Sequence, residues 1–197
     1  MRFEGERNNR IGSAFNRSNG TNRLFSAAEC DTVIHWLEER AGWDRTAPQS
    51  GTPELGNGLC QCNVIKLDPS LRNRAIDWLP RKLSDIVAAL NRKIWHFDID
   101  ELSELYLLRY DEGDQVTLHI DLNDARCRRK IAVLTQLSPA DAYQGGTLEY
   151  GFAPATLAAR EQGSVLAFPA WVPHRVTPIT SGRRYALSCF ALGPSFR

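Results

Sequence analysis

Two histidines and one aspartate in this sequence have the residue types and the spacing of a metal site. His119 and Asp121 are two positions apart, and side chains at that spacing in an extended strand project from the same face. His174 follows an apolar segment, Val165 to Val172, and supplies a third ligand if two strands of one sheet bring it beside His119. Two imidazoles and one carboxylate on one side of an ion, with the opposite positions open, are the ligands of non-haem Fe(II) oxygenases.

A pair of adjacent arginines follows the third candidate ligand. Arg183 and Arg184 come after the turn signal Ser181-Gly182 and begin a segment, Arg183 to Leu192, that we predict to be a strand. Neighbouring residues of a strand face opposite ways, so one of the two arginines can point inward. A guanidinium buried in an apolar cavity needs an anionic partner, because an unpaired buried charge is strongly destabilising. A ligand carboxylate would supply that partner.

The stretch from about Leu105 to Pro194 resembles the 2-oxoglutarate and Fe(II)-dependent dioxygenase superfamily, specifically its prolyl 4-hydroxylase-like branch. The motifs that carry the resemblance occur in the order found in that branch: Tyr110-Asp-Glu-Gly113, His119-Ile-Asp121, Arg129 to Ser138, Tyr143 to Glu149, and Gly163 to Pro169 leading to His174. The resemblance implies a double-stranded β-helix, or jelly roll, over about residues 100–194.

The resemblance also implies roles for individual residues. His119, Asp121 and His174 would bind Fe(II), and Arg184, ten residues after His174, matches the position that binds the distal carboxylate of 2-oxoglutarate. Arg183 falls where the branch has varied polar residues. Two hydroxyl-bearing side chains are expected to assist in binding the co-substrate, Tyr110 and Thr135.

The implied reaction consumes 2-oxoglutarate and O2, releases succinate and CO2, and hydroxylates an unactivated C–H bond. The substrate would be a prolyl or other peptidyl residue, or a free amino acid or small molecule resembling a natural product. Ascorbate is a candidate accessory reductant. Asp121 favours hydroxylation or desaturation, because related halogenases have a small residue at that position.

Three residues are candidates for the substrate side of the site. Trp171 and Arg175 lie close to His174 in the sequence, although a packing role suits both equally well. Gln136 stands where animal prolyl hydroxylases have a tyrosine. The branch usually has a bulky aromatic or basic residue just before the first histidine, whereas this chain has Thr117 and Leu118.

Two other classes of function use the same three ligands. A zinc hydrolase would activate water at this site. Hydrolysis does not require an arginine that binds a dicarboxylate, however, and the sequence near the motif offers no glutamate as an obvious general base. A degenerate binding module without turnover is the second alternative, and the intact ligand set disfavours it.

Composition excludes further classes. The chain has 24 basic and 23 acidic residues and a formal net charge of +1, so no general electrostatic attraction to nucleic acid or to a membrane surface is expected. No apolar stretch approaches the roughly 20 residues that span a bilayer, and the N-terminus has no signal-peptide core. Five cysteines without CxxC spacing are typical of free thiols in a reducing compartment. We therefore expect a cytoplasmic protein.

The order of elements predicts an α+β domain. Residues 1–23 are polar and are expected to form a flexible tail, and residues 24–197 are expected to form a single domain. A helix should start at the capping box Ser26 to Glu29 and close at Gly42, and a second should run from Arg72 to Arg92 with a break near Pro80. The segment 45–59 is predicted to be a loop, Cys60 to Leu67 a strand, and the chain after residue 98 a series of short strands. Helices followed by strands suit helices packed on one face of the β-structure.

Overall fold

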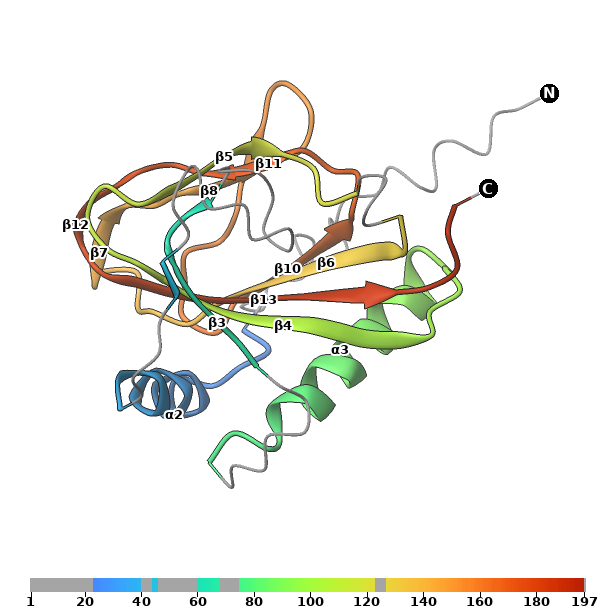
Figure 1. The fold of residues 1–197 in the computed structure, drawn as a ribbon, viewed down its shortest axis with the longest axis horizontal. Helices are drawn as coiled ribbons and strands as arrows, with labels where there is room; N and C mark the ends of the chain where they lie inside the picture. The colour runs from blue at the N-terminus through green and yellow to red at the C-terminus, as the bar shows by residue number, and fades with distance from the viewer. Residues whose placement is uncertain (1–22, 40–43, 46–59, 68–74, 123–126, 197) are drawn as a thin grey trace.

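The structure, a computed structural model, describes residues 23–39, 44–45, 60–67, 75–122 and 127–196 of the 197-residue chain. Two β-sheets face each other, and two helices cover the outer face of the larger sheet (Figure 1). The predicted tail, apart from Arg23, and the predicted loop from residue 46 to residue 59 lie outside the described residues. Arg23 forms an isolated antiparallel bridge with Ser164.

The larger sheet carries the long strands of the molecule. Its six strands are, in spatial order, β1 (Asp44–Arg45), β3 (Asn63–Lys66), β4 (Glu101–Tyr110), β13 (Arg184–Leu192), β6 (Arg129–Gln136) and β10 (Val165–Pro169). β13 pairs antiparallel with β4 on one side and with β6 on the other. The predicted strand after Ser181-Gly182 is therefore a central, buried strand.

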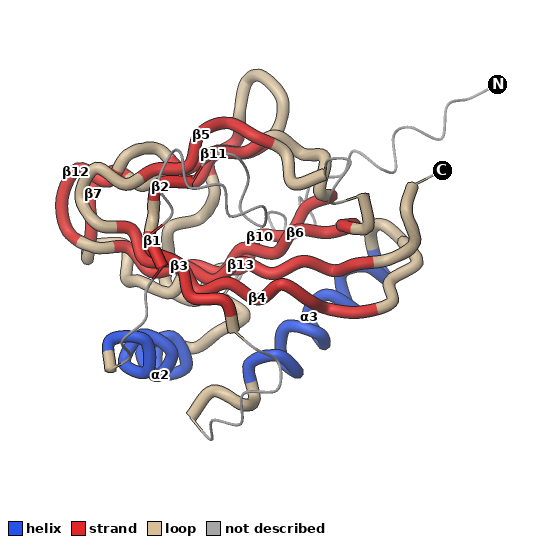
Figure 2. The backbone as a smooth tube through the Cα atoms, viewed as in Figure 1, coloured by secondary structure: helices blue, strands red, loops and turns tan. Residues whose placement is uncertain are grey.

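The smaller sheet has five short strands and faces the larger one (Figure 2). In spatial order they are β2 (Cys60–Gln61), β5 (Gln115–His119), β11 (His174–Val176), β8 (Leu148–Tyr150) and β9 (Thr156–Leu157). A separate two-stranded ribbon pairs β7 (Tyr143–Gly145) with β12 (Ile179–Gly182). The single strand expected over 60–67 is divided, because the chain leaves the smaller sheet at Cys62 and enters the larger one.

Strand alternation divides the apolar interior into two layers. Ile131 and Val133 of β6 belong to the layer beneath the helices, whereas Ala132 between them belongs to the layer between the sheets. The same alternation applies to β13, where Leu187 faces the helices and Ala186 faces the smaller sheet. Any site between the sheets is therefore built from every second residue of these strands.

The first helix, α2 (Ala27–Glu38), begins as predicted. The Ser26 hydroxyl accepts a hydrogen bond from the Glu29 backbone N–H, and the Glu29 carboxylate accepts one from the Ser26 backbone N–H at 2.7 Å. This capping box satisfies two backbone donors at the helix start. The helix ends at Glu38, so the predicted end at Gly42 is wrong by several residues, and Gly42 itself lies outside the described residues.

The second helix, α3 (Leu79–Lys93), corrects the prediction around Pro80. The sequence predicted a longer helix broken near Pro80, but Pro80 lies in the first turn of α3 and residues 75–78 form a turn. Proline is favourable there because the first turn leaves backbone N–H groups without helical partners in any case. Pro80 therefore begins the helix. None of the described helices is both long enough and apolar enough to cross a membrane.

The turn at Gly163 joins the start of α2 to the sheets and allows a test of the fold. The backbone N–H groups of Leu24 and Phe25 both donate to the Gly163 carbonyl, at 3.0 and 3.2 Å. Gly163 has φ +84°, and a Cβ built there would lie 2.0 Å from the Phe25 carbonyl oxygen. Gly113 has a similar φ of +86°, but a Cβ added to it would meet no atom within 4 Å.

We predict that Gly163→Ala destabilises the protein more than Gly113→Ala. The left-handed backbone alone costs about 1 kcal/mol in each variant, and the clash with Phe25 adds about 1–3 kcal/mol at residue 163 only. Urea unfolding of the two variants measures the difference in free energy of unfolding. Equal losses would show that the contact between the turn and Phe25 does not constrain the fold.

Candidate metal and co-substrate site

The two histidines meet across the smaller sheet. His174, the first residue of β11, is the direct register partner of His119, the last residue of β5, and the two ring centroids are 4.2 Å apart. The other register pair of these two strands is Val116 with Val176. It lies three residues away along β5 but only two residues away along β11, so β5 contains a bulge. The bulge lets Val116 and His119, an odd number of residues apart, both face the interior.

Asp121 reaches the same place from outside a strand. Its backbone N–H and that of Leu122 both donate to the Ala170 carbonyl, at 2.9 and 3.0 Å. The carboxylate then lies between the histidines, with Oδ1 3.7 Å from His119 Nε2 and Oδ2 3.5 Å from His174 Nε2. The sequence predicted that a continuous strand would align Asp121 with His119. The alignment instead comes from backbone hydrogen bonds beyond the strand end.

Main-chain carbonyls set the tautomers of both imidazoles. His119 Nδ1 lies 2.8 Å from the Thr117 carbonyl oxygen, and His174 Nδ1 lies 3.1 Å from the Val172 carbonyl oxygen. A carbonyl oxygen can only accept a hydrogen bond, so each Nδ1 carries the proton. Each Nε2 then offers a lone pair toward Asp121, as a metal ligand requires.

Electrostatics favour the protonation states that bind a cation. Burial raises the pKa of the Asp121 carboxyl, but the contact with His119 and the attraction to His174 and Arg129 outweigh burial, so that the pKa lies below its usual value. Burial lowers the pKa of His174, with a further lowering from His119, and Asp121 opposes both. An ionised carboxylate and a neutral imidazole are the forms that ligate metals.

The three side chains fit a divalent metal ion. One ligand atom from each of His119, Asp121 and His174 can be chosen so that all lie within 4.8 Å of one another. Two neutral imidazole nitrogens and one carboxylate suit Fe(II) by type and number, and no other group of three such residues in the described part of the chain has this spacing.

A cavity between the sheets is lined by the second predicted functional group, Arg184. Its side chain is 4% exposed, its Nε donates to Gln136 Oε1 at 3.0 Å, and its guanidinium carbon lies 5.0 Å from the Tyr110 ring centroid. The NH1 nitrogen is buried and has no hydrogen-bond partner among the described residues. Tyr150 of β8, which lines the same cavity, is the register partner of His174, so the cavity extends to the strand beside His174.

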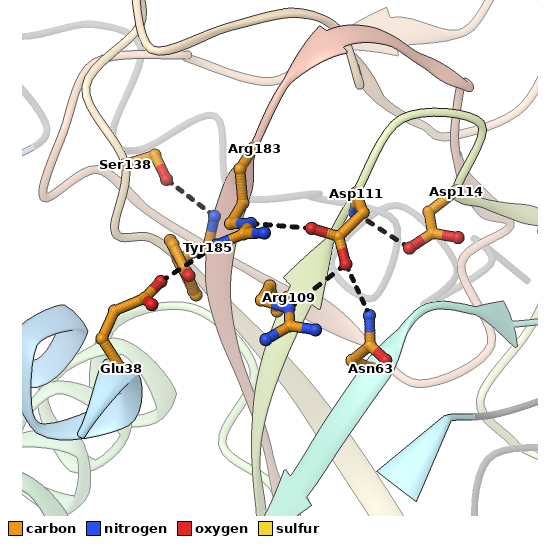
Figure 3. A network of polar contacts seen from close by, with 8 residues as sticks. All are labelled: Glu38, Asn63, Arg109, Asp111, Asp114, Ser138, Arg183 and Tyr185. Carbon is orange, nitrogen blue, oxygen red and sulfur yellow. Dashed lines mark hydrogen bonds and ion pairs between the residues drawn. The ribbon is translucent and has the colours of Figure 1, made fainter. Parts of the chain in front are cut away.

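Arg183 points the other way and is held on the outside. Its side chain is 46% exposed, its Nε donates to Asp111 Oδ1 at 2.7 Å, and its NH1 lies 3.4 Å from Glu38 Oε1 of α2 (Figure 3). Asp111 also contacts two side chains of the larger sheet, Arg109 and Asn63. The two neighbouring arginines are thus on opposite faces of the larger sheet, and the inward one is Arg184.

The remaining predicted co-substrate residues divide between the faces of the larger sheet. Tyr110 is buried between the sheets as the register partner of Arg184. Thr135 precedes Gln136 in β6 and pairs with Leu187, which faces the helices, so its side chain lies on the opposite face from Arg184. Its hydroxyl is buried without a hydrogen-bond partner in the described structure. Tyr110 therefore contacts Arg184, whereas Thr135 lines the same cavity but directs its side chain to the other face of the sheet.

The candidate substrate residues divide in a similar way. Trp171 packs edge-on against Phe97 and Phe196, with ring centroids 5.7 and 5.4 Å away. Arg175 lies on the outer face of β11, where its Nε donates to Glu149 Oε2 at 2.7 Å. Trp171 therefore has packing partners close to the site, and Arg175 faces away from His174.

Sequence reasoning missed one residue of the site, Arg129, and gave another, Gln136, a different role. Arg129 is 3% exposed, its NH1 lies 3.8 Å from Asp121 Oδ1, and its guanidinium carbon lies 3.6 Å from the Phe190 ring centroid. In the sequence, Arg129 was only the first residue of one motif of the resemblance, at the start of an apolar segment. Gln136 was expected on the substrate side, and it contacts Arg184 instead.

Comparison with known proteins agrees with this geometry. Residues 105–192 match the family model of the 2OG-Fe(II) oxygenase superfamily. A PKHD-type hydroxylase from Hyphomonas neptunium is 40% identical over 80 residues, which are 38% of this chain and 36% of the relative. A PKHD-type hydroxylase from Burkholderia ambifaria is 31% identical over 122 residues, or 55% of this chain and 52% of the relative. The matches thus span about a third to a half of the length of these curated relatives.

The fold agrees over most of the chain. A prolyl 4-hydroxylase from Pseudomonas putida superposes with a TM-score of 0.71 at 17% identity, covering 88% of this chain and 90% of the other. A prolyl hydroxylase from Trichoplax adhaerens, solved with a hypoxia inducible factor peptide fragment, gives 0.66 at 18% identity, covering 88% and 81%.

These findings confirm the predicted jelly-roll class with helices on one face. The cofactors of the family are Fe(II) and 2-oxoglutarate, and the cluster of His119, Asp121 and His174 fits the iron. The match over residues 105–192 supports a 2OG-Fe(II) oxygenase, and the fold is similar to that of prolyl 4-hydroxylases over most of the chain.

Proposed function

We propose that this chain is a 2-oxoglutarate- and O2-dependent Fe(II) hydroxylase of an unactivated C–H bond. The substrate is a prolyl or other peptidyl residue, or a free amino acid or natural-product-like small molecule, and the products of the co-substrate are succinate and CO2. The observation that carries the proposal is the cluster of His119, Asp121 and His174 together with a cavity lined by the buried Arg184, in which Tyr150 is the register partner of His174.

Each residue has a role that follows from its position. His119, Asp121 and His174 hold Fe(II), which when bound supplies the O2 chemistry that couples decarboxylation of 2-oxoglutarate to hydroxylation. Arg184 binds the distal carboxylate by a charge-assisted contact, and Tyr110 covers its guanidinium. The sheets exclude water from this contact, which strengthens it.

A peptide substrate is supported by the surroundings of His119. Leu118 and Ile120, which flank it in the sequence, are 64% and 45% exposed, so the end of β5 presents apolar surface to solvent. An apolar surface beside the metal ligands suits a prolyl ring or an aliphatic side chain better than a charged metabolite. The Trichoplax neighbour was solved with a peptide.

Arg184 also distinguishes this proposal from a zinc hydrolase with the same ligands. Water activation at zinc uses three protein ligands and a general base. Such a mechanism gives the buried guanidinium of Arg184 no function. A carboxylate ligand in the cavity would give the NH1 nitrogen of Arg184 the partner that the described residues do not supply.

We predict that His174→Ala weakens metal binding more than about 100-fold, because it removes a ligand, and even changes around the ligands of such sites cost about 10–100-fold. Anaerobic titration with Co(II), followed by its visible absorption, measures the affinity. His35→Ala, at an exposed histidine of α2, is the matched control and should bind Co(II) like the parent. Unchanged affinity in the His174 variant would place the metal elsewhere.

For the arginine pair, we expect Arg184→Met to weaken 2-oxoglutarate binding by about 10–100-fold, the effect of losing hydrogen bonds to a charged group. Arg183→Met removes the same charge from the outer face and should leave binding unchanged. Anaerobic Fe(II)-loaded protein is titrated with 2-oxoglutarate, and the weak visible charge-transfer band is followed. Equal effects in the two variants would contradict the assignment of Arg184.

Turnover provides the test of the reaction itself. Succinate release from 2-oxoglutarate should require Fe(II) and O2, and proline-containing peptides should stimulate it more than free amino acids do. Stimulation by free amino acids alone would move the substrate to the small-molecule class. Turnover that is indifferent to 2-oxoglutarate would overturn the proposal and favour a hydrolase.

A further inference from the structure

Gln136 and Arg184 form a buried pair at the end of the cavity. Gln136 is 6% exposed and Arg184 is 4% exposed, and the arginine Nε donates to Gln136 Oε1 at 3.0 Å. The pair joins two adjacent strands, since Gln136 is the register partner of Ala186 in β13. A neutral acceptor here satisfies one guanidinium donor without neutralising the charge.

The orientation of the Gln136 amide is determined by its other partner. Its Nε2 donates to the Ser138 carbonyl at 3.0 Å, so the amide oxygen must face the arginine. Ser138 is itself held, because its hydroxyl accepts a hydrogen bond from the Tyr185 backbone N–H at 2.7 Å. A rotated amide would place an NH2 group against a guanidinium, where two donors would face each other.

These contacts leave one edge of the guanidinium for a ligand. Gln136 occupies Nε, and the Tyr110 ring lies 5.0 Å from the guanidinium carbon. Gly146 lies beside the stem, where a Cβ would come within 3.3 Å of Arg184 Cδ. The NH1 nitrogen is buried and has no partner in the described part of the chain. A carboxylate that meets the two terminal nitrogens end-on accepts two parallel hydrogen bonds.

We propose that Gln136 is a positioning residue that fixes Arg184 for end-on binding of a second carboxylate, and thereby sets the preference for a 2-oxo diacid over a 2-oxo monoacid. The inference rests on the proposed function. It assigns Gln136 to the co-substrate, in place of the substrate contact expected from the sequence. Gln136 acts through Arg184 and needs no contact with the ligand.

The test compares two co-substrate probes that differ in the far carboxylate. Calorimetric titration of the anaerobic Fe(II)-loaded protein with 2-oxoglutarate and with 2-oxopentanoate gives the ratio of the two affinities. Gln136→Leu removes the acceptor and should weaken 2-oxoglutarate binding about tenfold, the effect of losing a hydrogen bond to a charged group. Its affinity for 2-oxopentanoate should stay the same.

Gln136→Glu keeps the acceptor and adds a charge. The new carboxylate pairs with Arg184 internally, so we expect an equal or larger loss of 2-oxoglutarate affinity with 2-oxopentanoate again unchanged. Gln162→Leu is the matched control, because that amide contacts Asp31 on α2 and should not alter the ratio.

The possible results distinguish a failure of the proposed function from a failure of the role assigned to Gln136. If the parent protein binds 2-oxoglutarate no better than 2-oxopentanoate, the proposed function fails. If the parent prefers 2-oxoglutarate and both Gln136 variants keep that preference, the role of Gln136 is refuted. Parallel losses for both probes would mean that Gln136 supports the cavity generally, and they too would overturn the positioning role.

Discussion

Polar and charged side chains buried between two apolar sheets must find partners, and the interior of this molecule is organised around that requirement. Asp121 is placed between two imidazoles, with the Arg129 guanidinium beyond it. Arg184 is held by Gln136, whose amide is held in turn by Ser138. Leaving such a group without a partner would cost more than most single packing contacts contribute. The described side chains satisfy each of these groups only in part. The ligand atoms around Asp121 can still bind a cation, and the guanidinium of Arg184 can still bind an anion.

The two sheets divide the work of building the site. The smaller sheet supplies the two histidines of the candidate metal site, and the segment after β5 supplies Asp121. Main-chain carbonyls of Thr117, Val172 and Ala170 set the orientation of these three residues. The larger sheet supplies Arg184 from the first residue of β13, which pairs with Tyr110 of β4, and from Ala186 onward β13 also pairs with β6. A ligand with one end on each group must bridge the layers. Binding is therefore linked to the packing of one sheet on the other.

Residue types and their spacing in the sequence were sufficient to predict much of the fold and of the candidate site. They identified the three clustered ligand candidates, the capping box of α2 and the strand that begins near Arg184. The sequence did not show which residues of β6 face the cavity, because the apolar run from Ile131 to Leu134 has no alternation. Thr135 and Gln136 both line the cavity, but the side chain that contacts Arg184 is that of Gln136. The contact between Gln136 and Arg184 joins residues 48 positions apart. Arg129 and the carbonyl of Ala170 act through tertiary geometry that no local pattern encodes.

The position of Arg184 on a strand limits how the length of a ligand can be measured. Residues on one face of a strand recur about every 7 Å, so moving the arginine to the next inward position of β13 would shift it by that amount. Such a step is far coarser than one methylene of a dicarboxylic acid. A slip of a single residue would be finer, but it would turn Arg184 outward and bring Arg183 in, together with the opposite face of the whole strand. Strand positions alone therefore cannot distinguish dicarboxylic acids that differ by one methylene. That discrimination has to come from how the guanidinium end of the Arg184 side chain is held.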